Sequence, residues 1–213
     1  MISEPDVTLT DYGLAIEAVV FAWLLRRRSD PEQPLGRWFV LFFASTSAAS
    51  LAGGTVHGFF LDPTSTGARI LWPAALIAIG GTALAAWGIG AYIQFSAKVA
   101  LWISRAATLA FASYAGVVMF GTQTFTVAIL NYLPPAIFLL VVFVLAHARV
   151  GDRTALVGAA GMLLTFVAAA SQQARLALHP HYFTHNAVYH LIQGVALVMV
   201  FTSARGFVGR RPC

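Results

Sequence analysis

Three ionisable residues fall inside long apolar stretches of this sequence, namely Glu17, His57 and His190. A charged group at the centre of a bilayer costs about 2.5–3.5 kcal/mol, so such residues normally face a partner or a water-filled cavity. Catalytic zinc commonly takes three protein ligands and leaves a fourth position for water. Two imidazoles and a carboxylate could therefore hold a zinc or iron ion. We expect a zinc ion bound by His57, His190 and Glu17.

Polar side chains at helical spacing accompany the two histidines. Ser50 precedes His57 by two helical turns, and Asn186 precedes His190 by about one turn, so each pair lies on one helix face. A zinc-bound water reacts near neutral pH, and a nearby polar group can orient it or stabilise an oxyanion. We therefore predict catalytic roles for Glu17, Ser50 and Asn186. The alternative is that these residues only hydrogen-bond or pack between helices.

Further polar or interface-seeking residues recur at a similar depth in the other apolar stretches. Their depth follows from a rise of about 1.5 Å per residue. A polar layer that most helices contribute to predicts a water-accessible pocket that opens toward the outer face. The expected pocket residues are Trp72, Tyr114, Asn131, Gln172, Gln173 and Gln193.

The elements that must position these residues are seven membrane-spanning helices. A helix needs about 20 apolar residues to cross the hydrocarbon core. The stretches that meet this requirement cover residues 9–25, 38–61, 70–93, 99–120, 125–146, 154–178 and 183–207. The loops between them are short, so we expect an all-α, polytopic seven-helix bundle that forms a single domain over residues 1–213.

Composition supports a membrane protein and excludes several other classes. Of the 213 residues, 59% are hydrophobic and only 10% are charged, and the mean hydropathy is +0.77. Soluble domains are nearer 45–50% apolar and about 25% charged. These values exclude a soluble globular domain, a disordered chain and a nucleic-acid-binding module. The single cysteine, Cys213, excludes an intramolecular disulfide framework.

Basic residues predict the orientation of the bundle. Loops on the cytoplasmic side of membrane proteins carry an excess of Lys and Arg. With the N-terminus outside and the C-terminus in the cytoplasm, two basic residues, Arg69 and Arg175, lie on the outer side. The other eleven lie on the cytoplasmic side: Arg26, Arg27, Arg28, Arg37, Lys98, Arg105, Arg149, Arg153, Arg205, Arg210 and Arg211. We expect a multi-pass protein of a bacterial-type plasma membrane.

The first stretch is expected to be retained rather than cleaved as a signal peptide. The segment that precedes it carries Glu4 and Asp6 and no basic residue. A secretory signal begins instead with a positively charged region.

The second and seventh stretches contain two short motifs of a known group. Ser47 to Ser50 followed by Gly53 to His57 resembles its second-helix motif, and residues 185–191 resemble its seventh-helix motif. The group is the superfamily of membrane hydrolases that includes the alkaline ceramidases and the adiponectin-receptor-like proteins. The resemblance implies a zinc site formed by a second-helix histidine and a seventh-helix HxxxH pair. Asn186 stands where that pair has its first histidine, and Glu17 could supply the third ligand.

These observations lead to one principal hypothesis and several alternatives. The principal one is a zinc-dependent, ceramidase-like hydrolase of lipid metabolism that cleaves a lipid amide or ester in the outward-opening cavity. The alternative is a non-enzymatic sensor, ligand-binding protein or small transporter that uses the same cavity for a membrane lipid or amphiphile. Paired histidines could also ligate haem. A retinal Schiff base is strongly disfavoured, because Lys98 is the sole lysine and is expected in a cytoplasmic loop. The oligomeric state stays open.

Overall fold

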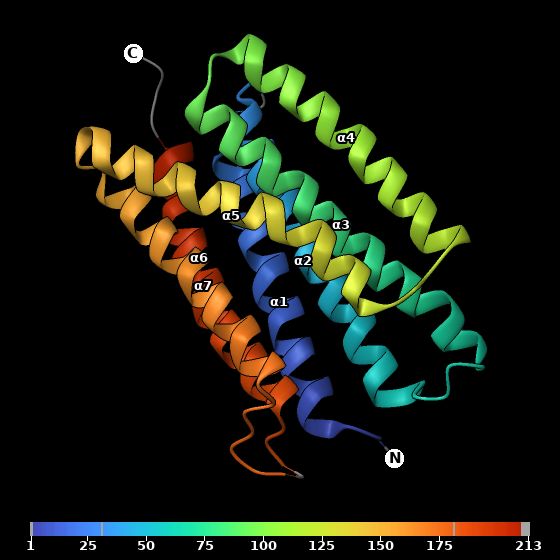
Figure 1. Ribbon diagram of the computed structural model, residues 1–213. Helices are drawn as coiled ribbons and strands as arrows, with labels where there is room; N and C mark the ends of the chain where they lie inside the picture. The colour runs from blue at the N-terminus through green and yellow to red at the C-terminus, as the bar shows by residue number, and fades with distance from the viewer. Residues whose placement is uncertain (1, 31, 181, 210–213) are drawn as a thin grey trace.

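A computed structural model describes residues 2–30, 32–180 and 182–209. These residues form seven α-helices and no strand (Figure 1), which confirms the predicted all-α class. The helices are α1 (Pro5–Arg28), α2 (Pro34–Phe59), α3 (Thr66–Gln94), α4 (Ala97–Phe120), α5 (Phe125–Val150), α6 (Arg153–Gln173) and α7 (His185–Val208). Arg210, Arg211, Cys213 and His181 lie outside the described residues.

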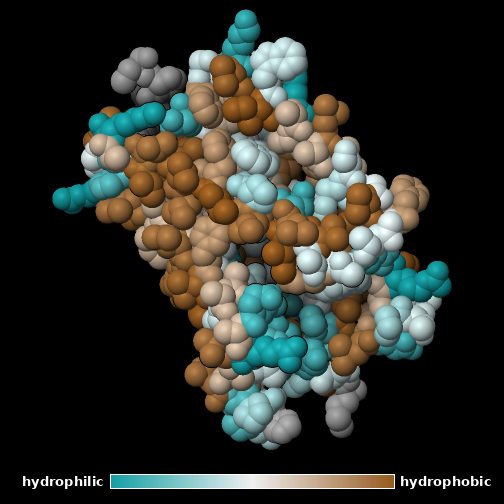
Figure 2. All heavy atoms as spheres, in the orientation of Figure 1, coloured by the Kyte–Doolittle hydropathy of each residue, from teal (hydrophilic) through white to brown (hydrophobic). Residues whose placement is uncertain are grey.

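All seven helices are long and apolar enough to cross a membrane. Large hydrophobic side chains remain exposed along the helices, including Trp102 at 61% and Leu109 at 71%. Figure 2 shows such hydrophobic residues over much of one face of the molecule. Exposed apolar side chains of this density are expected where lipid, rather than water, surrounds a bundle.

The helix ends differ from the predicted ends where local capping outweighs hydropathy. α1 begins at Pro5, four residues earlier than predicted, because proline is well suited to the first turn of a helix. It continues through Arg28, where basic side chains suit the C-terminal end of the helix dipole. α6 ends at Gln173, five residues earlier than predicted, and is followed by Arg175 with a φ of 53°.

Six of the helices form a closed ring. In the order α1, α2, α3, α5, α6, α7, each helix contacts the next one, and α7 also contacts α1. α4 packs against α3 outside this ring, as Figure 1 shows. The interior of the ring is therefore reachable by side chains of every helix except α4.

The two halves of the ring interior are filled differently. Toward the end that holds the C-terminus, buried residues such as Phe39, Phe43, Leu139 and Met162 form the main hydrophobic core. Phe21 stacks on Phe201 there, with ring centroids 4.1 Å apart. Toward the end that holds the N-terminus, the ring encloses a cavity.

Candidate functional site: an amphipathic cavity with a buried Asp–His pair

The cavity has a volume of about 400 Å³ and is lined by α1, α2, α3, α5, α6 and α7. Phe42 and Leu197 line it and also belong to the main hydrophobic core, so the core forms the floor. Ligand sites for small molecules typically have volumes of about 300–1,000 Å³. The cavity is large enough for part of a lipid-sized molecule.

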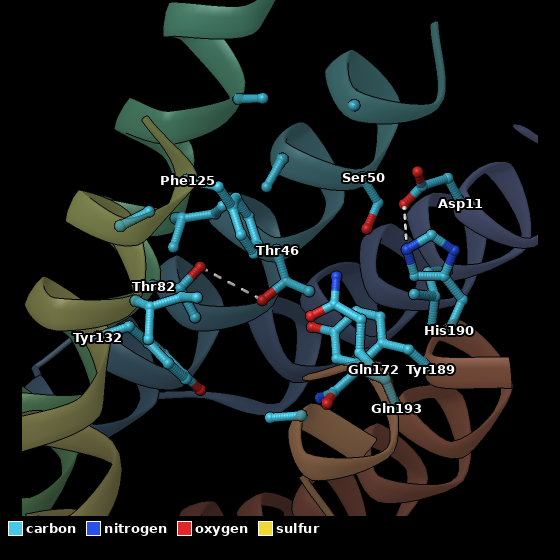
Figure 3. Close-up of a pocket in the computed structure, with 18 of the residues that line it drawn as sticks. Asp11, Thr46, Ser50, Thr82, Phe125, Tyr132, Gln172, Tyr189, His190 and Gln193 are labelled. Carbon is cyan, nitrogen blue, oxygen red and sulfur yellow. Dashed lines mark hydrogen bonds and ion pairs between the residues drawn. The ribbon is translucent and has the colours of Figure 1, made fainter. Parts of the chain in front are cut away.

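The walls of the cavity differ in polarity. α3 and α5 contribute a mainly apolar wall that includes Trp72, Leu76, Ile79, Ile129 and Leu133. The opposite wall, from α1, α6 and α7, is mainly polar, and its polar members are Asp11, Thr165, Gln172, Gln173, Asn186, Tyr189, His190 and Gln193. Figure 3 shows the labelled side chains of the two walls facing one another across the space. Such an arrangement is complementary to a molecule with one polar and one apolar side.

The cavity opens on the flank of the bundle between α5 and α6. Three lining residues of α5 are also exposed: Phe125 at 37%, Ile129 at 37% and Leu133 at 41%. From α6, the exposed residues Ala169 and Gln173 line the cavity. Figure 2 shows a hollow on the face that α5 crosses, with hydrophilic side chains beside it. A molecule within a bilayer could reach this opening sideways.

A buried acid–imidazole pair lies on the polar wall. His190 Nε2 lies 3.3 Å from Asp11 Oδ1, and both side chains are largely buried, at 11% and 7% exposure. Ser50, on α2, lies beside the Asp11 carboxyl group and also lines the cavity. Figure 3 shows Asp11, Ser50 and His190 pointing toward one another from three helices. Asp11 thereby links α1, α2 and α7.

The hydrogen bonds of Thr10 restrict the protonation of His190. Thr10 Oγ1 lies 2.8 Å from the carbonyl of Asp6, one turn earlier in α1, and 3.0 Å from His190 Nδ1. A hydroxyl has one hydrogen, and when it goes to the Asp6 carbonyl, Oγ1 accepts from the Nδ1–H of His190. One further proton, on His190 Nε2 or on Asp11, would then make the pair neutral as a whole. Neutrality suits a site shielded from water.

His57 lines the cavity but pairs with a different acid. Its Nδ1 contacts Glu4 Oε2 at 2.5 Å, and the two side chains are 28% and 41% exposed. Asp62, the acid that follows His57 in sequence, lies in the exposed loop after α2. There the hydroxyl and the amide of Thr64 donate to Asp62 and lower its pKa. Asp62 therefore stabilises a turn.

The structure brings together most of the residues that the sequence singled out. The predicted residues that line the cavity are Ser50, His57, Trp72, Gln172, Gln173, Asn186, His190 and Gln193. Asn186 Oδ1 accepts a hydrogen bond from Gln172 Nε2 at 3.2 Å. The Trp72 indole donates to the carbonyl of Gln123 at 2.8 Å.

Three predicted site residues lie elsewhere. Glu17 faces the seam between α1 and α7, where its Oε2 would be 3.2 Å from a Cβ placed at Gly194. Tyr114 lies on α4 outside the ring, and its hydroxyl donates to the carbonyl of Leu76. Asn131, on α5, is not among the described residues that line the cavity. The sequence predicts how deep these residues lie along their helices, but it does not predict whether the face that carries them points into the cavity.

The predicted zinc ligands do not form a metal site. Among residues 2–30, 32–180 and 182–209, no three His, Cys, Asp or Glu side chains are grouped so that they could hold a metal ion. Both ring nitrogens of His190 already face Asp11 and Thr10, and Glu17 lies outside the cavity lining. The residues present therefore do not fit a zinc ion bound by His57, His190 and Glu17.

Asp11 is a candidate functional residue that hydropathy alone does not single out. With the first span starting at residue 9, Asp11 falls at its outer edge, where an acid needs no partner. Proline followed by an acidic residue is a recognised helix start, and Pro5-Asp6 could have extended the span to residue 5. Asp11 would then have been six residues inside a helix.

Comparison with known proteins places the chain in a family. No curated protein and no solved structure shows significant similarity to it. A family of unknown function, DUF6962, matches residues 7–208, which include every helix apart from the first two residues of α1. The chain therefore belongs to the DUF6962 family.

Proposed function

We propose that this protein is an integral-membrane protein that binds an amphiphilic molecule in the cavity, and that the amphiphile enters from the bilayer between α5 and α6. One observation carries the proposal: a cavity with an apolar and a polar wall opens on the flank of an apolar bundle. An opening at the bundle end would favour a water-soluble ligand. An opening on the flank favours a ligand that partitions into lipid.

The predicted orientation places the cavity in the outer half of the membrane. With the N-terminus outside, the Asp11–His190 pair lies about two helical turns below the outer end of α1. A polar head group at this depth would contact the polar wall, and its chain would lie against Leu76, Ile79 and Leu133. The basic loops on the opposite side support this orientation.

Ligand binding is testable with the purified full-length protein in lipid nanodiscs and N-dodecylacetamide, an uncharged lipid amide, as the probe. Ala49 lines the cavity, whereas its neighbour Ala48 is exposed. We expect the probe to raise the unfolding temperature of wild type and Ala48→Phe, because it binds only the folded state. Ala49→Phe fills the cavity and should abolish the shift. Equal shifts in all three proteins would refute the cavity as the binding site.

A second candidate function is hydrolysis of the bound amide or ester, and the Ser50–Asp11–His190 cluster favours it. Asp11 and His190 lie 3.3 Å apart, so the pair could accept a proton from water and return it, as general acid–base catalysis requires. The water oxygen would bond to the carbonyl carbon, and the C–N or C–O bond would break. The proton would pass to the departing amine or alcohol, leaving a carboxylic acid as the other product.

A further inference from the structure

The side-chain oxygen of Gln193, a residue of the cavity wall, is a buried hydrogen-bond acceptor without a partner among the described residues. Gln193 is 8% exposed and lines the cavity, and its Oε1 has no hydrogen bond within the described residues. The Nε2 of Gln193 donates to Thr165 Oγ1 at 3.3 Å. The Thr165 hydroxyl in turn donates its own hydrogen to the carbonyl of Gly161. That arrangement fixes Oε1 as the free atom of the amide. Buried polar atoms normally have partners, so this one requires a donor.

The neighbouring hydroxyls on α2 and α3 also present acceptors. Thr46 Oγ1 donates to the carbonyl of Phe42 at 2.8 Å, and Thr82 Oγ1 donates to that of Ala78 at 3.3 Å. The two oxygens lie 3.4 Å apart and line the cavity, as Figure 3 shows. Each hydroxyl oxygen has two lone pairs, so the pair keeps acceptor capacity even when one hydroxyl donates to the other. Together with Gln193, they make the inner part of the cavity rich in acceptors.

The charge of the cavity favours the same kind of ligand. Asp11 lines it, and none of the described lining residues is Lys or Arg. A carboxylate, sulfonate or phosphate head group would find no Lys or Arg among the described lining residues to balance its charge, and it would bring further acceptors. The free-energy cost of removing this anionic head group from water would not be offset by new hydrogen bonds or ion pairs in the cavity. A hydroxyl or ammonium group would instead donate to the free acceptors.

We propose that Gln193 selects amphiphiles whose head group donates hydrogen bonds and carries no negative charge. This inference rests on the proposed amphiphile-binding function and specifies its ligand class. Gln193 Oε1 receives the donor, and Thr46 and Thr82 offer further acceptors. Alcohols, amides with an N–H and primary amines meet the requirement, whereas anionic lipids do not.

Four amphiphiles with the same C12 chain separate charge from hydrogen-bond donation. They are dodecanol, dodecylammonium, dodecyltrimethylammonium, which is cationic without a donor, and dodecanesulfonate, which is anionic. Apparent Kd values come from the ligand-induced rise in unfolding temperature of the full-length protein in nanodiscs. We expect dodecanol and dodecylammonium to bind at least about tenfold more tightly than the other two, a factor typical of one lost hydrogen bond.

Gln193→Leu keeps the approximate volume and removes the acceptor. It should weaken binding of the two donor-bearing amphiphiles about tenfold and leave the other two unchanged. Gln94→Leu, at the far end of α3, should change none of the four. If Gln193→Leu does not fold, Gln193→Met serves the same purpose, and the order of the four ligands in wild type stands as an independent test.

The possible failures are distinguishable. Dodecanesulfonate binding as tightly as dodecanol, or an unchanged order in Gln193→Leu, overturns the role of Gln193 while amphiphile binding stands. If none of the four amphiphiles gives a shift that Ala49→Phe removes, the proposed function itself fails.

Discussion

Asp11 is the side chain on which the proposed chemistry of the cavity depends. It contacts His190 and Ser50, and Thr10 beside it contacts the other nitrogen of the same imidazole. A buried pair of this kind is costly to break, because removal of one partner leaves the other polar group unsatisfied. Substitutions at Asp11 should therefore affect both stability and any reaction in the cavity.

Replacing Asp11 tests the hydrolysis candidate. Asp11→Asn keeps the shape of the side chain and prevents it from accepting a proton, so release of dodecylamine from N-dodecylacetamide should fall by about 10²–10⁴-fold. Asp30→Asn, in the exposed loop after α1, is the matched control and should leave turnover unchanged. Product release is measured by mass spectrometry. Turnover that survives in Asp11→Asn would remove Asp11 from the mechanism.

The site could be predicted in part from residue type alone. His57, His190 and Ser50 were identified because polar residues in apolar stretches require a partner, and all three line the cavity. The partners themselves could not be predicted. Which acid meets which histidine depends on the faces that helices present to one another, and a single sequence does not specify these. Residue type and depth therefore favour Glu17 over Asp11, and they give no indication of Glu4 as the partner of His57.

The close approach of α1 and α2 positions Asp11. A Cβ on Gly54 would lie 2.7 Å from Asp11 Cβ, and one on Gly58 would lie 2.9 Å from Thr8 Oγ1. Gly54 and Gly58 are one turn apart on the same face of α2, and such small-residue pairs let helix backbones approach closely in membranes. The two glycines thus hold α1 at the distance that the Asp11 contacts require.

Gly54→Ala should push α1 away from α2. We expect a loss of about 1–3 kcal/mol of stability from overpacking, and weaker binding of N-dodecylacetamide as Asp11 moves. Gly13→Ala, on α1 where nothing lies within 4 Å of the added methyl group, should be neutral or slightly stabilising. Unfolding temperatures of the two variants in nanodiscs provide the comparison. Similar values for both would mean that the glycine contact does not determine the position of α1.

Hydropathy was sufficient to predict the helices but not their arrangement. All seven predicted stretches overlap the observed helices, because about 20 consecutive apolar residues are a strong local signal. The position of α4 outside the ring was not predictable, because an apolar helix can pack equally well at several places around a bundle. Tyr114 was for that reason expected in the pocket, although it lies on α4.

The molecule as a whole is a ring of helices whose two ends differ. The half toward the C-terminus is filled by the hydrophobic core, and the half toward the N-terminus holds the cavity. If the basic loops lie in the cytoplasm, as the sequence predicts, the cavity faces the outer leaflet. The orientation would therefore determine which leaflet supplies the proposed ligand.

Cysteine labelling in intact cells tests this orientation. In a Cys213→Ser background the chain has no other cysteine. Thr64→Cys, in the exposed α2–α3 loop, should react with a membrane-impermeant maleimide, because that loop is predicted to lie outside. Ser96→Cys, in the α3–α4 loop, should react only after permeabilisation. The reverse pattern would place the cavity in the inner leaflet.

Photocrosslinking can locate the ligand within the protein. An N-dodecylacetamide analogue with a diazirine in its chain is bound to the protein in nanodiscs, and the adducts are mapped by mass spectrometry. We predict adducts on apolar cavity residues such as Leu76, Leu133 and Phe166, and their loss in Ala49→Phe. Adducts confined to the exposed residues Leu109, Val117 and Leu163, and unchanged in Ala49→Phe, would show that the amphiphile contacts only the outside of the bundle and would contradict the proposal.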